Sequence, residues 1–181
     1  MLLSNGKQLG SGQGPFGPGR WKTDNSLRDH TIYYPTKIPR INKIPVLIWG
    51  NGGCNNVGTS NSALLQQVAS YGFLAIAEGA PNGGGSSNSS TMNQAIEWVV
   101  KNAGRGVYAN VDATQIMAAG FSCGGLEAID VIWNKNVDTI GVISSGLLSN
   151  YTAAQAWRKP VLFVLGGSND TAYPNVCPYP A

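Results

Sequence analysis

Short apolar runs and amphipathic segments alternate along most of this sequence, and this alternation constrains the fold more than any other feature. A short apolar run bounded by Gly, Pro or Asn is typical of a buried strand, and apolar residues at helical spacing predict a helix packed on one side. The expected strands are 30–34, 45–49, 73–77, 115–120, 139–144 and 161–165, and the expected helices are 61–71, 92–100, 124–133 and 153–157. This order predicts an α/β fold with a mainly parallel, doubly wound sheet and helices on both faces.

The length of 181 residues suits one domain. Residues 1–29 are rich in Gly, Pro and polar residues and lack periodicity, which predicts an irregular N-terminal arm. We expect residues 30–181 to form the single folded domain.

Charge and hydropathy argue against two classes of partner. The net charge is +3 and the 12 Lys and Arg residues are scattered, so we expect no nucleic-acid partner. No apolar run approaches the ~18 residues that a membrane-spanning helix needs, so we expect no membrane span.

Three sequons and the cysteines favour an extracellular protein. The sequons begin at Asn88, Asn150 and Asn169, and Asn88 and Asn150 are the candidate glycosylation sites. The four residues before Asn5 are too few for the apolar part of a signal peptide. Secretion would therefore require a signal peptide that this chain does not contain.

Ser122 is the strongest candidate for a chemically active residue. It lies in Gly120-Phe121-Ser122-Cys123-Gly124, which matches the G-x-S-x-G turn that exposes a nucleophilic serine between a strand and a helix. An expected strand precedes this motif and an expected helix follows it. Small residues suit a strained turn that leaves no space for bulky side chains, so we predict that Ser122 is a nucleophile. The alternative is a Gly-rich turn with a buried hydroxyl.

A second Gly-rich loop follows the strand at 45–49. In a serine hydrolase of this architecture such a loop gives one backbone N–H to the oxyanion hole, and the residue after the nucleophile gives the other. We predict that these donors are Gly53 and Cys123, with Cys54 as the alternative to Gly53.

Asp170 is the candidate acid, because it lies in the loop that leaves the last expected strand and follows the serine in chain order. The acidic residues Asp130, Asp138 and Glu127 fall on an expected helix or the loop after it, and we expect them to be solvated surface charges.

The only histidine, His30, precedes the nucleophile on the first expected strand, where this architecture does not place its general base. The chain order His30, Asp112, Ser122 would suit a two-barrel β fold that this sequence does not resemble. We expect His30 to be a structural polar residue.

Several segments together resemble secreted fungal α/β-hydrolases, related to polyester-hydrolase and cutinase-like, or dienelactone-hydrolase-like, serine esterases. They are 17–36, the loop at 50–54, the motif at 120–125 and the strand end at 166–170, and the resemblance extends over nearly the whole chain. It implies Ser122 as nucleophile, Asp170 as triad acid and main-chain donors at Gly53 and Cys123.

The family's histidine would lie a few tens of residues beyond Asp170, whereas this sequence ends at Ala181. We therefore expect an α/β-hydrolase domain that is incomplete at its C-terminus, lacks its last strand and helix, and is hydrolytically incompetent alone.

The residues flanking the expected oxyanion donors include two cysteines. Since the fold would bring their backbones together, we predict a disulfide between Cys54 and Cys123, which leaves Cys177 unpaired. The alternative is two buried free thiols.

The function predicted from these features is hydrolysis of a carboxylic ester through an acyl-enzyme on Ser122, with no cofactor and no metal. The substrate would be a small-molecule or polymer ester. An alternative is a non-catalytic secreted α/β-hydrolase-like protein or fragment with an interaction role. A nucleotide-binding protein is disfavoured, because the loop at 50–54 matches neither G-x-G-x-x-G nor G-x-x-x-x-G-K-[ST].

Overall fold

The computed structural model describes residues 12–38, 43–148 and 151–173. These residues form one seven-stranded sheet in the order β1-β2-β4-β3-β5-β6-β7. The five strands from β4 to β7 in this order run parallel, and β2 and β1 are added antiparallel at one edge. The strands are β1 (Gly19–Asp24), β2 (Leu27–Pro35), β3 (Ile44–Gly50), β4 (Leu74–Glu78), β5 (Val111–Phe121), β6 (Thr139–Ile143) and β7 (Val161–Val164).

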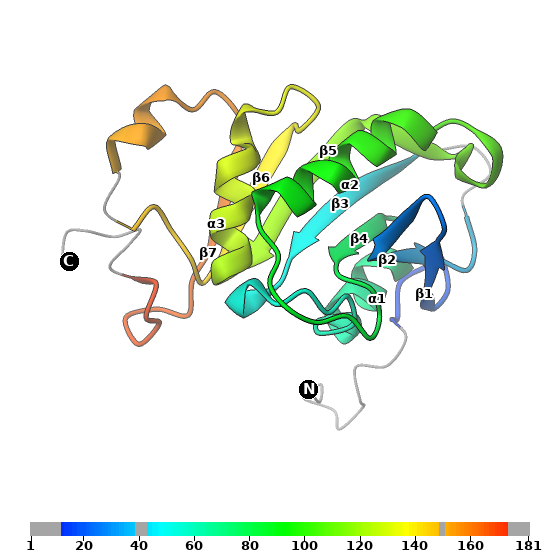
Figure 1. Cartoon of the computed structure of the whole chain (residues 1–181), viewed down its shortest axis with the longest axis horizontal. Helices are drawn as coiled ribbons and strands as arrows, with labels where there is room; N and C mark the ends of the chain where they lie inside the picture. Colours follow the sequence, from blue (N-terminus) through cyan, green and yellow to red (C-terminus); the bar gives the residue numbers. More distant parts are fainter. Residues whose placement is uncertain (1–11, 39–42, 149–150, 174–181) are drawn as a thin grey trace.

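Helices cover both faces of this sheet (Figure 1). The helix α1 (Ser62–Ser70) packs on one face through Leu65 and Ala69, which join a core cluster with side chains of β2 to β5. The helices α2 (Ser89–Asn102) and α3 (Cys123–Asp130) cover the other face and bury the larger core cluster. The predicted α/β class, with a mainly parallel sheet between helices, is confirmed at this level.

The prediction of an irregular arm over residues 1–29 is wrong for its second half. Strand β1 pairs antiparallel with β2, with Trp21 opposite Tyr33 and Lys22 opposite Ile32, and β2 itself begins at Leu27. The turn between these strands is fixed by Asp24, whose Oδ1 accepts hydrogen bonds from the N–H and the hydroxyl of Ser26. Only Gly19 of β1 is buried, so the strand lacks the apolar pattern by which a strand is recognised in a sequence.

The helices begin and end for local reasons. The side chain of Asn88 caps α2 by accepting hydrogen bonds from the N–H groups of Ser90 and Thr91. The expected helix at 124–133 is shorter than predicted, because α3 ends at Asp130 and continues as the 3-10 turn η3 (Val131–Trp133). The expected helix at 153–157 is the 3-10 segment η4 (Tyr151–Ala156). Two further 3-10 turns are η1 (Gly52–Cys54) and η2 (Gly106–Tyr108).

Candidate active site

Ser122 lies at the carboxyl end of β5, in the turn that leads directly into α3. Its backbone has φ 51° and ψ −117°, a conformation that a residue with a side chain rarely adopts and that costs about 1–3 kcal/mol. Its N–H donates to the carbonyl of Ile143 on β6 at 2.9 Å, which holds the turn against the neighbouring strand. The Ser122 side chain is solvent-exposed. A strained, exposed serine between a central strand and a helix is the geometry expected of a nucleophile turn.

The glycines around Ser122 are required by close packing. A Cβ on Gly120 would overlap the backbone of Gly124, and a Cβ on Gly124 would overlap the backbone of Gly50. A Cβ on Gly125 would lie 2.5 Å from the Cβ of Ser145. The N–H of Gly124 donates to the carbonyl of Asn51 at 3.0 Å, so α3 begins in contact with the loop after β3.

The loop after β3 is joined covalently to the start of α3. Cys54 and Cys123 form a disulfide with a Cα separation of 5.1 Å, so the predicted bridge is confirmed and the alternative of two free thiols is wrong. Cys177 lies outside the described residues. Gly53 adopts φ 66°, which favours glycine. Gly53 lies in the first turn of η1 and Cys123 is the first residue of α3, positions whose N–H groups have no partner within their own helical turn and can point toward a bound oxygen atom.

Asp170 lies in the loop after β7, at the same end of the sheet as Ser122. Its two carboxylate oxygens accept hydrogen bonds of 2.9 Å from the N–H groups of Gly166 and Ala172. These bonds, in that order, and a further bond from the side chain of Ser144 lower the pKa of Asp170 below the usual carboxyl range. The carboxylate is therefore ionised at neutral pH and linked to Ser144.

A hollow of about 230 Å³ lies between the Ser122 turn and the loop that contains Asp170. Its lining includes Ser122 and Cys123 from the turn between β5 and α3, Ser144 directly after β6, and Thr171 and Ala172, the two residues after Asp170. The carboxyl ends of β5, β6 and β7 therefore bring a serine hydroxyl, a second hydroxyl and an ionised carboxylate to one place.

His30 lies elsewhere. It is buried in β2, only 1% exposed, and its Nε2 is 3.0 Å from the carbonyl of Thr91 on α2. Burial lowers the pKa of His30, so its imidazole is neutral at neutral pH. It does not line the hollow that contains Ser122. Since the sequence contains one histidine, the 181 residues supply no imidazole to this site.

The expectation that Glu127 is a solvated surface charge is wrong. Glu127 is 4% exposed, and its Oε1 accepts a hydrogen bond of 2.9 Å from the hydroxyl of Ser87. Asp130 and Asp138 are exposed, as expected. Glu78, the last residue of β4, is fully buried near Glu127, and sequence reasoning missed it. The available signal was a carboxylate at the end of the continuous apolar run 73–77.

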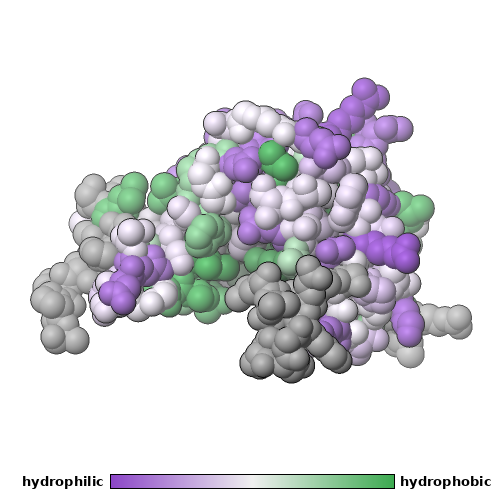
Figure 2. Space-filling model, turned by 90° about the horizontal axis from the view of Figure 1, so that it is seen from below, coloured by the Kyte–Doolittle hydropathy of each residue, from purple (hydrophilic) through white to green (hydrophobic). Residues whose placement is uncertain are grey.

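The aromatic residues near the motifs differ in exposure. Trp49 is 2% exposed and belongs to the core beneath α1, whereas Phe121 is 43% exposed beside Ser122. Figure 2 shows hydrophobic residues gathered toward the side of the molecule where α3 and β7 lie, and the exposed hydrophobic residues of this region include Phe121, Leu148, Leu162 and Val164.

Two glycosylation sites were also predicted from the sequence. Asn88 is exposed at the start of α2, and Asn150 lies outside the described residues. No group of His, Cys, Asp and Glu suited to a metal ion occurs in the ranges 12–38, 43–148 and 151–173. None of the described helices is long and apolar enough to span a membrane.

No protein-family model matches this sequence, and no curated protein matches it either.

Proposed function

We propose that this protein has the α/β-hydrolase fold and that Ser122 is the nucleophile of a carboxylic-ester hydrolase. The observation that carries the proposal is the backbone of Ser122. A serine with φ 51° is held between a central parallel strand and a helix by glycines that tolerate no Cβ, and its side chain is exposed. Strain of this kind persists only where the surrounding structure enforces it, and it is concentrated at functional sites.

The reaction would proceed through an acyl-enzyme. The hydroxyl of Ser122 loses its proton to an imidazole, and its oxygen attacks the ester carbonyl carbon. The negative charge that develops on the carbonyl oxygen is stabilised by the N–H groups of Gly53 and Cys123. The alcohol leaves with the proton, and water then hydrolyses the acyl-enzyme by the same route. Asp170 orients the imidazole and stabilises its protonated form.

None of the 181 residues supplies an imidazole at Ser122, so the base in this reaction has to come from outside these residues. Exogenous imidazole can test this directly, because a small base can enter a site that lacks its side chain. We expect the 181-residue chain to cleave an activated ester very slowly and to gain a Ser122-dependent rate when imidazole is added.

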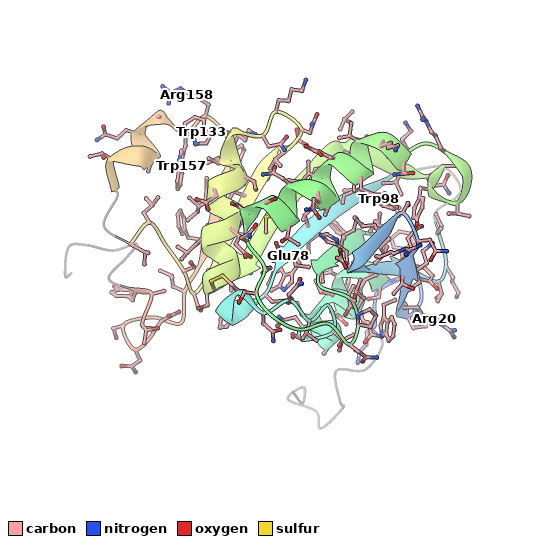
Figure 3. All side chains as sticks on the ribbon, viewed as in Figure 1. Arg20, Glu78, Trp98, Trp133, Trp157 and Arg158 are labelled. Atoms are coloured by element: carbon pink, nitrogen blue, oxygen red, sulfur yellow. A yellow bond between two sulfur atoms is a disulfide. The ribbon has the colours of Figure 1, made fainter. Side chains whose placement is uncertain are left out.

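A second, mostly apolar hollow beside the one at Ser122 supports a hydrophobic acyl group, in a small-molecule or polymer ester. A hollow of about 540 Å³ shares Leu126, Gly146 and Leu148 with the hollow at Ser122 and is also lined by Trp133 and Trp157. Figure 3 shows both tryptophans on the α3 and η4 side of the molecule.

The test is a series of p-nitrophenyl esters of increasing acyl length, measured with added imidazole on the wild type and on Ser122→Ala. We expect turnover that rises with acyl length and is lost in the variant. Equal rates for both proteins would contradict the proposal.

A second candidate function, a non-catalytic one, is favoured by the position of His30. With the only histidine buried on β2, the fold would serve as a non-catalytic scaffold with an interaction role. In that case imidazole would restore no Ser122-dependent rate.

We also propose that the protein is secreted. The Cys54–Cys123 disulfide suits an oxidising compartment, and the exposed Asn88 is accessible to glycosylation. Expression in a eukaryotic secretion host, followed by enzymatic deglycosylation, should reduce the apparent mass of the wild type and leave that of a variant without sequons unchanged.

A further inference from the structure

A buried cluster of acidic and basic groups lies under the loop that follows β3. His30 on β2 is directly opposite Glu78 on β4 in the antiparallel register, so both side chains are on the face covered by α2 and α3. Glu127 approaches this cluster from α3. The exposed fractions of Glu78 and Glu127 are 0% and 4%. Figure 3 shows Glu78 in the interior of the molecule.

The two carboxyl groups face each other with only the hydroxyl of Ser87 as a donor beside them. In the described part of the chain, neither oxygen of Glu78 accepts a hydrogen bond from a fixed donor group, and the same is true of Oε2 of Glu127. The polar neighbours of the Glu78 carboxyl group are the Glu127 carboxyl group, which can bond to it through a shared proton, and the Ser87 hydroxyl. The groups that surround the pair are His30 from β2, Gly50 from β3, Ser87 from the segment before α2, and Glu127 itself from α3. No Lys or Arg among the described residues contributes to the environment of Glu78. Only a proton on one carboxyl group can satisfy the pair, because two buried carboxylates this close cannot both be ionised at low cost.

The pair is attached to the loop that contains Gly53. Glu127 accepts from the hydroxyl of Ser87, and the N–H of Ser87 donates to the carbonyl of Cys54 at 2.8 Å. A Cβ on Gly50 would lie 2.8 Å from Oε2 of Glu127, so the loop backbone packs against this carboxyl group. The carbonyl of Glu78 accepts from the side chain of Asn51 at 3.1 Å. The loop is thus held through the carboxyl group of Glu127 and through the main chain of Glu78, and the Glu78 carboxyl group acts on it by way of Glu127.

We propose that Glu78 and Glu127, sharing one proton, are positioning residues that hold the Gly50–Cys54 loop against α3 and so set the distance between the N–H groups of Gly53 and Cys123. The inference rests on the proposed function, because these two N–H groups are its oxyanion donors. Loss of the shared proton places two like charges in one buried space and releases the loop.

The titration of Glu78 supports this inference. Burial, followed by the hydrogen bond and the negative charge of Glu127, raises the pKa of Glu78 to about 9. Since a carboxyl with a raised pKa is bound to its proton in the folded state, the held loop persists below this pH and is lost as the pH rises through it. His30 is neutral over this range, because burial lowers its pKa.

The experiment measures two properties of the same proteins from about pH 6 to about pH 10. The first is the rate at which a fluorophosphonate labels Ser122, with imidazole present. The second is the rate at which a phosphine reductant opens the Cys54–Cys123 disulfide, which reports on the loop whether or not Ser122 reacts. The variants are Glu78→Gln, which mimics the protonated carboxyl, and Glu127→Gln, which removes the neighbouring charge. Glu97→Gln, an exposed change on α2, is the control.

In the wild type and the control, we expect labelling to fall by ~10–100-fold and reduction to accelerate as the pH rises through about 9, since a misplacement of about 1 Å costs such factors. Glu78→Gln should abolish both changes, and Glu127→Gln should move them to lower pH. Identical reduction profiles for Glu78→Gln and the wild type would overturn the inference. If Ser122 is not labelled in any protein, the proposed function fails, and the reduction profiles still decide whether the pair positions the loop.

Discussion

Removal of the Cys54–Cys123 disulfide should destabilise the protein and disorganise the Ser122 site together. The bridge closes a loop with a sequence separation of 69, for which the chain-entropy relation gives a loss of roughly 4 kcal/mol in the free energy of unfolding. The same bridge joins the loop of Gly53 to the first residue of α3, so its loss should also slow the labelling of Ser122 by ~10–100-fold.

The perturbation is the double variant Cys54→Ala/Cys123→Ala, with Cys177→Ala as the control. Urea unfolding followed by tryptophan fluorescence gives the free energy of unfolding of each protein. If the double variant does not fold, the wild type measured with and without reductant makes the same comparison. A loss of less than about 1 kcal/mol in the free energy of unfolding would show that the bridge does not constrain the unfolded chain in this way. An unchanged rate of Ser122 labelling would show that the bridge does not organise the Ser122 site.

Three further changes test what stabilises the fold. Gly124→Ala should cost about 2–3 kcal/mol in the free energy of unfolding, because its Cβ would overlap the backbone of Gly50 at the end of β3. Gly84→Ala, where a Cβ meets no atom within 4 Å, should cost little, and equal chemical denaturation curves for the two variants would contradict this. Asn88→Ala should cost about 1 kcal/mol through the lost cap of α2, and Asn88→Ser should restore most of it, as read from thermal unfolding. Tyr108→Phe removes the hydrogen bond from the Tyr108 hydroxyl to Asp24 and should lower the free energy of unfolding by about 1 kcal/mol at neutral pH. Hydrogen bonds from Ser26 and then Tyr108 lower the pKa of Asp24, so the stability difference between variant and wild type should vanish as the pH falls through that lowered pKa. A stability difference independent of pH would refute this assignment.

The order of strands and helices could be predicted from the sequence because burial on both faces leaves continuous apolar runs such as 45–49 and 73–77. The turn at Ser122 could also be predicted from the sequence, since its strand, glycines and helix are contiguous in the chain. The disulfide followed from the positions of Cys54 and Cys123 beside that turn.

What the sequence did not reveal depends on contacts between distant segments. Strand β1 exists because Trp21 and its neighbours pair with β2, although they bury little apolar surface themselves. In the sequence, Glu127 is a charged residue on an expected helix and would ordinarily face solvent. It is buried because α3 packs against Gly50. The same packing brings it to Glu78, a proximity that no spacing in the sequence encodes.

The central claim is that Ser122 is a nucleophile, and covalent labelling tests it most directly. The purified chain is treated with a fluorophosphonate in the presence of imidazole, digested and mapped by mass spectrometry. In this reaction the Ser122 oxygen bonds to phosphorus, fluoride leaves, and imidazole takes the proton. We predict a single labelled peptide that contains Ser122, retained in the exposed control Ser168→Ala and lost in Ser122→Ala. Labelling that survives Ser122→Ala, or no labelling of the wild type at any imidazole concentration, would contradict the claim.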